Sequence, residues 1–519
     1  MVFMYLIARV ASHHFQHMLL IRKENKSSPC SSQGDYTNVY TAGVRPPARA
    51  GALVALDAVV RAGVDVQAAL DDSLSHASLS RQDAALCTEL VYGYLRSEIR
   101  LSWLIRRFLK APSKLPPGVL ALLCLAAYEL TQCDRVPAYA TLDWAVSAVR
   151  ALYGTGVSRL ANAVLRNVDR LGDAWRVADF YACVADNRDR LCVRHSAPRW
   201  LVDLWCDGYG EEKATALLEA SLLHPAPGVR INLARADGAD CLQQLLSGNA
   251  GAGRQASGKA GVVFTSGGTP SELTSLISEG RASRQSGASQ SALAALEPEV
   301  WPGPVWDCCC GRGGKTAALV ETGVAVVAAS DPSMSRLRGL RRDFARLGLP
   351  VPLAVRASAV RPPFSCAAST ARAGSCGDGG SPLAIDGIEV EVSRGQSATG
   401  LVNASGLGSG GLFGTILVDA PCSGLGTLSR RPDIKRKRTT AQIAELVALQ
   451  EAILDAVWPC LRSDGVLAYI TCTRNPQENE LRIAAFLERH PDARLEITYE
   501  TPLEDVSREF FYAARLRKA

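Results

Sequence analysis

The stretch GTILVDAPCSG, residues 414–424, runs from an apolar segment into an acid, a proline, a cysteine and two small residues. Four more short aliphatic runs lie between residues 304 and 473: PVWDCC, VAVVAAS, VPLAVRAS and GVLAYITCT. Short apolar runs of this kind are typical of parallel strands that are covered on both faces. Because helical segments separate most of them, we expect a doubly wound α/β sheet, to which LEITY and FFYAARL add antiparallel strands at one edge.

The chain before this α/β segment is predicted to be helical. From about residue 46 to 171 apolar residues recur at helical spacing, and Ser80 with Asp83 forms a capping box. Helices continue to the short alternating strand GVRINL at residues 228–233. The expected division is a leader at 1–45, an all-α domain at 46–172, linker helices and a small subdomain at 173–300, and an α/β domain at 301–519 with an insertion at 366–411.

Two stretches are rich in Gly, Ser and Ala, and they interrupt this pattern. The first, at about residues 236–300, includes SGNAGAGRQASGKAG, and the second, at 366–411, includes STARAGSCGDGG. Such a composition buries little apolar surface, so we expect flexible insertions. Within the second stretch, GIEVEVSRG (387–395) could add a hairpin strand.

The composition is that of a large globular chain. With 519 residues, of which 47% are hydrophobic, it can form two to four domains with ordinary cores. No apolar run reaches the roughly 18 residues of a membrane-spanning helix, and the first residues resemble a mistaken start or a disordered leader more than a signal. A net charge of +6 permits a polyanionic partner without requiring one.

The sixteen cysteines favour reduced thiols and a cytoplasmic protein. They are spread over a large chain without a CxxC pair, which disfavours a disulfide framework. Cys308, Cys309 and Cys310 are consecutive, and neighbouring side chains on a strand point to opposite faces, so the three cannot readily share one ion. We therefore expect no metal.

Reactive side chains follow four of the predicted strands, at the edge where α/β sheets bind their ligands. Asp307 precedes the glycine turn CCCGRGGKT, and Asp331 ends the next strand, where it could bind ribose hydroxyls or merely cap a helix. Asp419 with Cys422, and then Cys472, end two more strands. A single cysteine is more often packing than chemistry, but two at one edge beside a nucleoside site favour chemistry.

This set of residues suits methylation of a pyrimidine. Carbon 5 of a pyrimidine is a poor nucleophile, but a thiolate added at carbon 6 converts it to an enamine that attacks an electrophilic methyl group. An acid near N3 assists the addition, and the proton on carbon 5 must leave before the thiol can be eliminated. A sulfonium cofactor bound by carboxylates and a glycine loop would supply the methyl group.

These residues resemble the RNA (cytosine-5) methyltransferases and, within them, the RsmB/Sun family that acts on 16S ribosomal RNA. The resemblance rests on DAPCSGLGTLSRRPDIK (419–435), on ALQEAILDAVWPCLRSDGVLAYITCT (448–473) followed by NPQENE (475–480), and on DCCCGRGGKT (307–316), which is similar to the family's D-x-C-A-A-P-G-G-K-T. The all-α region, including SRLANAVLRNVDR (158–170), resembles the RNA-binding fold of the antitermination factor NusB. Only the leader and the two Gly/Ser-rich stretches fall outside the resemblance.

The resemblance implies a fold, an activity and a set of site residues. It implies a NusB-like domain followed by a Rossmann-like domain that uses S-adenosylmethionine. The thiol of the later motif, Cys472, would be the nucleophile, Cys422 would promote product release, and Asp419 would lie between cofactor and cytosine. The cofactor would bind at Asp331, at Asp419 and on the loop residues Cys309, Cys310, Gly311, Arg312, Gly313, Gly314 and Lys315.

Three departures from the family pattern bear on the cofactor site and the nucleophile motif. The loop's Ala-Pro is replaced by Gly311-Arg312, which brings a large cation near a positively charged cofactor. TCT replaces the usual TCS around Cys472. The acid that the family carries after its third strand should fall near Ser358, where this chain has neither Asp nor Glu.

The expected partner is unassembled or partly assembled 16S ribosomal RNA, because a base inside a duplex cannot present carbon 6 to a thiolate. Phosphate contacts would come from Arg430, Arg431 and Lys435 of the basic run RRPDIKRKR, although such a run can equally be a solvated loop. Arg230 would add another contact unless its strand is only a structural edge. We expect a monomer. The alternatives are the same chemistry on transfer RNA, or a non-catalytic RNA-binding assembly factor.

Overall fold

The computed structural model of the chain describes residues 46–76, 79–247, 253–265, 272–364, 383–385, 388–391 and 412–519. The predicted leader at 1–45 and most of the predicted insertion at 366–411 lie outside these residues. Among the described residues, no helix is long and apolar enough to cross a membrane.

The chain divides into two compact units. The first extends to Leu222 and includes the short segment Arg431–Lys437, whereas the second holds Leu223–Arg430 and Arg438–Ala519. The helices predicted as linkers after residue 172 therefore belong to the first unit, where α8 (Asn187–Arg194) packs against α5 (Arg81–Arg107).

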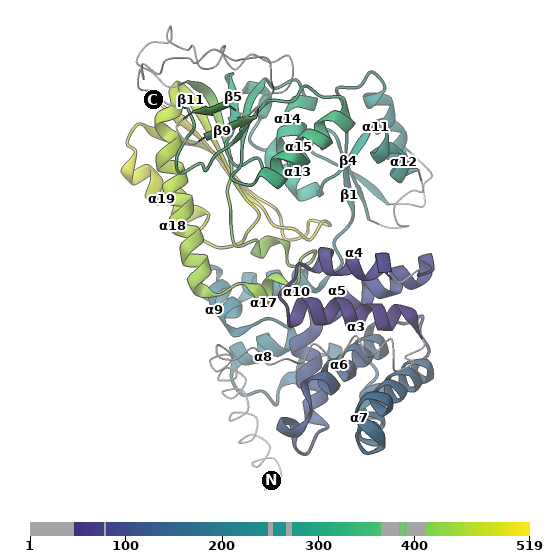
Figure 1. Cartoon of the computed structure of the whole chain (residues 1–519). Helices are drawn as coiled ribbons and strands as arrows, with labels where there is room; N and C mark the ends of the chain where they lie inside the picture. The colour runs from purple at the N-terminus through teal and green to yellow at the C-terminus, as the bar shows by residue number, and fades with distance from the viewer. Residues whose placement is uncertain are drawn as a thin grey trace. The chain divides into compact units, whose positions relative to one another are not determined.

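The described residues of the first unit form helices joined by loops, as the sequence predicts (Figure 1). Ser80 caps α5 by accepting a hydrogen bond from the Asp83 backbone N–H. Within this unit α7 (Ala138–Asp169) is kinked, because Gly154 adopts a left-handed φ of 81° in its interior. The other α-helices of the unit are α3 (Pro47–Val60), α4 (Val66–His76), α6 (Pro117–Gln132), α9 (Arg199–Tyr209), α10 (Glu211–Leu222) and the short α17 (Ile434–Lys437).

The segment Arg431–Lys437 docks into this unit through its charged side chains. Lys435, which is 6% exposed, donates from Nζ to the carbonyl oxygens of Arg96 (2.9 Å) and Ser196 (2.8 Å). Burial lowers the pKa of Lys435 to about 7. Arg431 pairs with Asp65 at 2.9 Å. Of these two predicted RNA contacts, Lys435 is therefore a buried structural contact, whereas Arg431 is exposed and pairs with Asp65 at the surface.

We expect Lys435→Met to release this segment from the first unit. The substitution leaves two buried carbonyl groups without a donor, at a cost of about 2–4 kcal/mol. Release would free the backbone at residues 436–438 to enter the protease site, so limited digestion with trypsin should cut there much faster than in the wild type. Arg431→Gln removes only an exposed ion pair and serves as the control. Equal cutting rates in the two variants would contradict the anchoring role of Lys435.

The second unit is built on a nine-stranded mixed sheet in the order β12-β13-β11-β10-β5-β6-β7-β9-β8. The central strands β7, β6, β5, β10 and β11 are parallel, and β13 and β9 run antiparallel to their neighbours. This confirms the doubly wound sheet with antiparallel edge strands. The strands are β5 (Val305–Asp307), β6 (Val326–Ser330), β7 (Leu353–Arg356), β8 (Leu383–Ile385), β9 (Ile388–Glu391), β10 (Phe413–Asp419), β11 (Leu461–Thr471), β12 (Ala493–Glu500) and β13 (Tyr512–Lys518).

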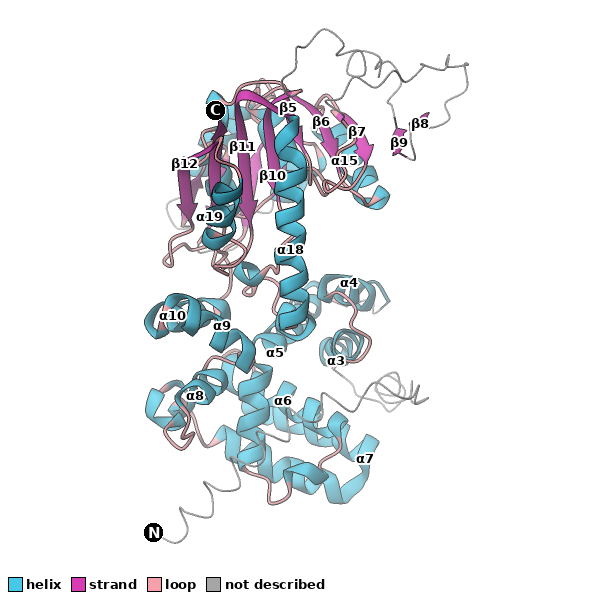
Figure 2. Cartoon of the chain, turned by 90° about the vertical axis from the view of Figure 1, so that its left-hand side faces the viewer, coloured by secondary structure: helices cyan, strands magenta, loops and turns pink. Residues whose placement is uncertain are grey.

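Helices cover both faces of this sheet. On one face, α18 (Thr440–Val457) and α19 (Glu480–Arg489) lie over β10 and β11 (Figure 2). The other face carries α13 (Gly287–Ala294), α14 (Gly314–Glu321) and α15 (Met334–Leu347). The apolar strands are thus buried on both sides, which explains why their sequences do not alternate.

A smaller antiparallel sheet, in the order β2-β3-β1-β4, occupies much of the stretch predicted to be flexible. That prediction is wrong for the described residues, because Val262, Phe264 and Leu273 form a hydrophobic core with neighbouring helices. Few apolar residues suffice for this core, and they are easily overlooked among Gly and Ser. The elements are β1 (Gly228–Ile231), α11 (Gly238–Ser247), β2 (Arg254–Ser257), β3 (Gly261–Phe264), α12 (Leu273–Ser278) and β4 (Ala282–Arg284).

Candidate active site

Two thiols that are fifty residues apart in the sequence meet at the carboxyl edge of the large sheet. The strands β10 and β11 are parallel neighbours with Asp419 paired to Ile470, so the loops that follow them start side by side. The sulfur atoms of Cys422 and Cys472 are 3.3 Å apart. Both side chains are only half-buried, so a ligand at this edge could reach them.

The two thiols differ in acidity because they share one hydrogen bond. That bond from Cys422 lowers the pKa of Cys472 below its ordinary value, and it raises the pKa of Cys422 well above its own. The positive charge of Lys315 acts in the same direction on Cys472. Cys472 is therefore the thiol that loses its proton first, and a thiolate is the nucleophilic form of cysteine.

A buried carboxylate holds the two thiol loops together. Glu478 has no exposed surface, and it accepts hydrogen bonds from the backbone N–H (2.8 Å) and the hydroxyl (2.5 Å) of Ser423, the residue after Cys422. Asn475, in the loop after Cys472, donates to Glu478 at 2.9 Å. The side-chain amide of Gln450 on α18 donates to the same carboxylate at 3.0 Å and to the Pro421 carbonyl oxygen at 2.9 Å.

An ion pair lies beside the thiols. Lys315, in the first turn of α14, places its Nζ 2.7 Å from Oδ2 of Asp419 at the end of β10. Burial alone would lower the pKa of Lys315, but the attraction of Asp419 prevails and raises it above its ordinary value. Lys315 is therefore a fixed positive charge between the glycine loop and Cys472.

Asp307, at the end of β5, is a second carboxyl group in this region. It is 1% exposed and accepts a hydrogen bond of 2.6 Å from the Thr316 hydroxyl. Burial raises the pKa of Asp307 to about 7, and the negative charge of Asp419 adds to the rise. The protonation state of Asp307 therefore changes near neutral pH.

We expect Asp307→Asn to change the pH dependence of stability. Between the unfolded pKa of 3.8 and the folded pKa of about 7, the folded protein binds a proton that the unfolded chain does not, so stability falls as pH rises through this window and is level above it. The variant lacks this pH-dependent contribution. Between pH 5 and pH 7 its free energy of unfolding should therefore rise by about 2 kcal/mol relative to that of the wild type. Urea unfolding of both proteins at pH 5 and pH 7 measures this change. If the free-energy difference between variant and wild type is the same at both pH values, Asp307 is ionised throughout.

The glycine loop between β5 and α14 leaves its backbone accessible. Gly311 and Gly313 have left-handed φ values of 56° and 80°, and a Cβ added at Gly311 or Gly314 would meet no atom within 4 Å. At Gly313 an added Cβ would come within 2.8 Å of the Leu340 side chain, so glycine is required there for packing. The open backbone beside the start of α14 fits a nucleoside-containing cofactor.

The remaining predicted cofactor residues lie around this loop. Cys309 is partly exposed, whereas Cys310 is buried and its N–H donates to the Ser330 carbonyl oxygen at 3.0 Å. Asp331 is buried, and its carboxylate accepts hydrogen bonds from the backbone N–H groups of Gly311 (3.2 Å) and Ser333 (2.7 Å). This carboxylate therefore orders the loop, and a ribose would have to compete for it.

The structure shows the surroundings of two of the three departures from the family pattern, Arg312 and the missing acid near Ser358. Arg312 is 67% exposed and turns toward α15, where its Nη2 lies 3.6 Å from Asp343. Its charge is thus partly balanced by an acid outside the loop. After β7, the described residues 357–364 include Ser358 and contain no acid. Among the described residues, no group of three or more His, Cys, Asp or Glu side chains could hold a metal ion.

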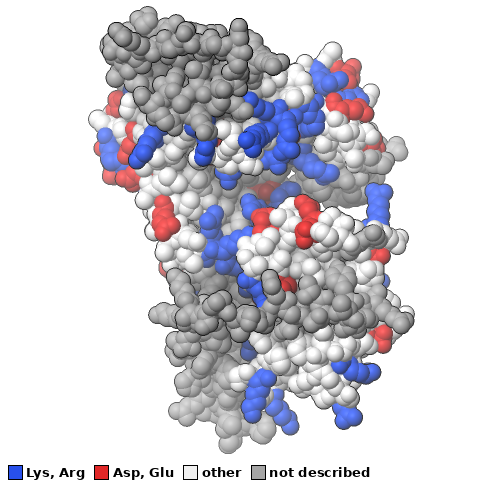
Figure 3. Space-filling model, viewed as in Figure 1, with Lys and Arg blue, Asp and Glu red and all other residues white. Residues whose placement is uncertain are grey.

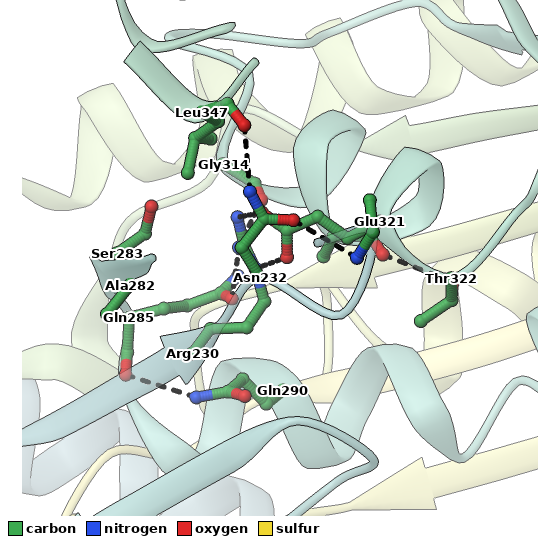
Figure 4. A network of polar contacts seen from close by, with 12 residues as sticks. Arg230, Asn232, Ala282, Ser283, Gln285, Gln290, Gly314, Glu321, Thr322 and Leu347 are labelled. Atoms are coloured by element: carbon green, nitrogen blue, oxygen red, sulfur yellow. Dashed lines mark hydrogen bonds and ion pairs between the residues drawn. The ribbon is translucent and has the colours of Figure 1, made fainter. Parts of the chain in front are cut away.

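Two of the predicted RNA contacts are committed to structural ion pairs in the second unit. Arg230 is 4% exposed, and its guanidinium binds Glu321, the Gln285 side chain and the Gly314 carbonyl oxygen (Figure 4). Arg230 therefore cannot reach a phosphate in this structure, and its role is to tie β1 to α14. Arg430 is more exposed but forms a bidentate pair with Glu509 at 3.1 and 3.2 Å.

Sequence reasoning missed the residues that support the thiols. Glu478 lies in the quoted segment NPQENE, and Gln450 lies in ALQEAIL, yet neither was assigned a role. The sequence feature that could have indicated this role is an amide and an acid three residues apart, Asn475 and Glu478, shortly after Cys472. Ser423, the partner of Glu478 in the other thiol loop, lies 55 residues from Glu478 in the sequence, so only the folded chain shows that they meet.

Comparison with known protein families gives three matches along the chain. Residues 397–513 match the family described as 16S rRNA methyltransferase RsmB/F. Residues 46–170 match the NusB family, and residues 197–269 match the ferredoxin-like domain of RsmF/B-like methyltransferases. The order of the matches follows the helical unit, the small sheet and the large sheet.

Relatives match over most of their length. The ribosomal RNA small subunit methyltransferase B of Vibrio cholerae is 32% identical over 459 residues, which cover 86% of this chain and 90% of the relative. The probable ribosomal RNA small subunit methyltransferase B of Bacillus subtilis is 29% identical and covers 85% of this chain and 88% of its own. The crystal structure of PH0851 shares the fold, with a TM-score of 0.64 at 18% identity over 91% of this chain and 99% of that one. The chain therefore belongs to the RsmB/F family of 16S rRNA methyltransferases.

Proposed function

We propose that this protein methylates carbon 5 of a cytosine in 16S ribosomal RNA through a covalent bond between Cys472 and carbon 6. The observation that carries the proposal is the 3.3 Å contact between the sulfur atoms of Cys472 and Cys422, beside the ion pair of Lys315 and Asp419. Two thiols of different acidity next to a carboxylate supply the groups that addition to a pyrimidine and subsequent elimination require.

Cys472 acts first. Its lowered pKa favours the thiolate, and Lys315 stabilises the negative charge on that sulfur. The sulfur forms a bond to carbon 6, and electron density shifts to carbon 5. Asp419 is the carboxyl group at this edge that we assign to the N3 side of the base, held in place by its bond to Lys315.

Cys422 acts after methyl transfer. Its raised pKa comes first from the hydrogen bond to Cys472, and that bond is lost once the Cys472 sulfur is bonded to carbon 6. The pKa of Cys422 then falls, so Cys422 can release its own proton to solvent and, as a thiolate, take the proton from carbon 5. The electron pair of that C–H bond re-forms the double bond of the ring, and the bond between carbon 6 and Cys472 breaks.

S-adenosylmethionine, when bound, supplies the electrophilic methyl group for carbon 5. The residues that would hold it are the glycine loop from Cys309 to Lys315 together with Asp331 and Asp419, whose open backbone and acidic side chains fit a cationic nucleoside. Arg312 is directed toward Asp343 and does not oppose this assignment.

The substrate assignment follows from chemistry and from the relatives. Carbon 6 of a stacked and paired cytosine is out of reach of a thiol, so the base must be in single-stranded or distorted RNA and turn out of its stack. The relatives from Vibrio cholerae and Bacillus subtilis are named as small subunit methyltransferases. We therefore assign ribosomal RNA of the small subunit, taken before full assembly, in preference to transfer RNA.

A non-catalytic assembly factor is the competing function, and two observations favour it: the Gly311-Arg312 replacement and the lack of an acid at 357–364. Calorimetric titration with S-adenosylmethionine discriminates between the two. Micromolar affinity supports the enzyme, whereas the absence of binding favours the assembly factor.

Bisulfite sequencing of RNA from a deletion strain tests the proposed activity directly. The expected result is the loss of one protected cytosine in 16S ribosomal RNA and its return when the wild-type chain is expressed. A complete set of 16S signals in the deletion strain, or a signal lost from transfer RNA, would overturn the substrate assignment.

A further inference from the structure

The helix α15 carries an unusual density of positive charge. Its fourteen residues, MSRLRGLRRDFARL, contain five arginines and a single acid, Asp343. The apolar residues Leu337, Leu340 and Phe344 face the sheet and are buried. The arginines therefore have to lie on the flanks and on the outer face of the helix, where Figure 3 shows basic side chains gathered.

The five arginines of α15 differ in their surroundings. Arg336 is exposed and pairs with Asp331 at 3.4 Å, and Arg341 is half-buried. Arg346 is structural, because its guanidinium donates to the carbonyl oxygens of Ile277 (2.6 Å) and Ala282 (3.0 Å). Arg338 and Arg342 are exposed, are four residues apart on the outer face and form no ion pair within the described parts of the chain. Like charges at this spacing destabilise a helix, so packing and folding give no reason for them.

The glycine loop adds a third cation to this face. The side chain of Arg312 lies over Gly339 of α15, where a Cβ would come within 3.0 Å of its Nε. Its contact with Asp343 at 3.6 Å is exposed and leaves most of the guanidinium in solvent. Arg312, Arg338 and Arg342 thus form one exposed basic surface, which we call the α15 surface.

The α15 surface starts at the reactive edge of the sheet. The helix begins three residues after Asp331, which follows the carboxyl end of β6. The thiols follow the carboxyl ends of β10 and β11 in the same sheet, and these strands are parallel to β6. A long polyanion whose reacting base lies at Cys472 can therefore extend along this edge to the α15 surface.

We propose that Arg312, Arg338 and Arg342 bind phosphate groups of the RNA that flanks the target cytosine. Only the choice of RNA as the polyanion rests on the function proposed above. Arginine suits this role because its guanidinium stays charged and binds phosphate oxygens through two parallel hydrogen bonds. Such contacts set the position of the RNA and release counterions without reading sequence.

The test compares two charge-matched double variants. Arg338→Gln with Arg342→Gln removes two charges from the α15 surface. The control, Arg462→Gln with Arg494→Gln, removes two exposed charges from the starts of β11 and β12, at the opposite edge of the same sheet. Affinity for an unmodified 16S RNA fragment is measured for both variants and for wild type between 50 and 300 mM salt, without cofactor.

The expected result is a shallower salt dependence for the α15 variant alone. Each lost phosphate contact should reduce the slope of log K against log salt by about 0.7–0.9, so the slope should change by roughly 1.4–1.8, with affinity about tenfold or more weaker near 0.1 M salt. The KM for RNA should rise, and kcat at saturating RNA should stay unchanged. Equal slopes and affinities for the two double variants would overturn the proposal.

Failure of this proposal can be told apart from failure of the proposed function. RNA affinity is measured without methyl transfer, so an inactive protein can still show the α15 effect. Conversely, an active enzyme whose two double variants bind RNA equally well refutes only the α15 surface. Urea unfolding midpoints of the variants show that both remain folded, since all four arginines are exposed.

Discussion

Cys472→Ser is expected to abolish methylation of the RNA. A serine hydroxyl at this position has an ordinary pKa far above that of a thiol and is a poor nucleophile, so the rate should fall by roughly four orders of magnitude or more. No covalent complex with the RNA should form. Methyl transfer from radiolabelled cofactor, together with denaturing gels of enzyme mixed with RNA, measures both results.

Cys422→Ser is the informative partner of this variant. If Cys422 removes the proton from carbon 5, its loss should stop the reaction after methyl transfer and leave the RNA bonded to Cys472. The denaturing gel should then show a stable complex that accumulates with time and contains the transferred methyl group. The double variant Cys422→Ser/Cys472→Ser should show no complex, which identifies the sulfur that carries it.

The reverse pattern would contradict the roles assigned here. A stable complex in Cys472→Ser together with none in Cys422→Ser would make Cys422 the nucleophile. Cys460→Ser provides the control, because this thiol is buried at the other end of β11, and its replacement should leave both the rate and the gel pattern unchanged.

Glu478→Ala is expected to have the second largest effect, and it should act on stability and activity together. The substitution leaves the Ser423 N–H, the Ser423 hydroxyl and the amides of Asn475 and Gln450 without their common acceptor in a buried site. The loss should cost about 3–5 kcal/mol of unfolding free energy. Urea unfolding measures the cost, and the covalent complex of the Cys422→Ser background should decline in parallel.

A conservative variant separates positioning from stability. Glu478→Gln keeps the shape but places an NH₂ group among donors, so the protein should stay folded while the two thiol loops lose their alignment. We expect a lower kcat with little change in the KM for RNA, because the nucleophile is misplaced and the RNA surface is intact. Glu445→Ala, at an exposed position of α18, is the control. A kcat equal to wild type in Glu478→Gln would show that Glu478 does not align the thiols.

The architecture of the second unit could be predicted because buried parallel strands have a simple pattern. Five aliphatic runs, each followed by polar residues, indicate both the sheet and the edge where its ligands bind. The small sheet was missed for the opposite reason. Its apolar residues are few and are scattered among Gly and Ser, and their burial depends on helices elsewhere in the sequence.

The basic run RRPDIKRKR shows why charge alone is a weak guide to function. Its positive charge is compatible with phosphate binding, yet Lys435 is buried against two carbonyl oxygens and Arg430 is paired with Glu509. The arginines of α15 were not singled out from the sequence, although Arg338 and Arg342 are exposed and form no ion pair among the described residues. A cationic side chain is available to RNA only if the folded protein does not already bind it through its own carbonyl oxygens or carboxylates. These partners are a property of the folded chain.

The sequence by itself determined the family and the two-part architecture and indicated the groups that we propose to react, because motifs and apolar periodicity are local properties of the chain. The tertiary structure decided which groups meet. The 3.3 Å contact of the thiols, the pairing of Lys315 with Asp419 and the carboxylate of Glu478 that joins the two loops all link residues more than twenty-five positions apart. Hydrogen bonds and pKa shifts act over a few ångströms in space, so only the fold can set them.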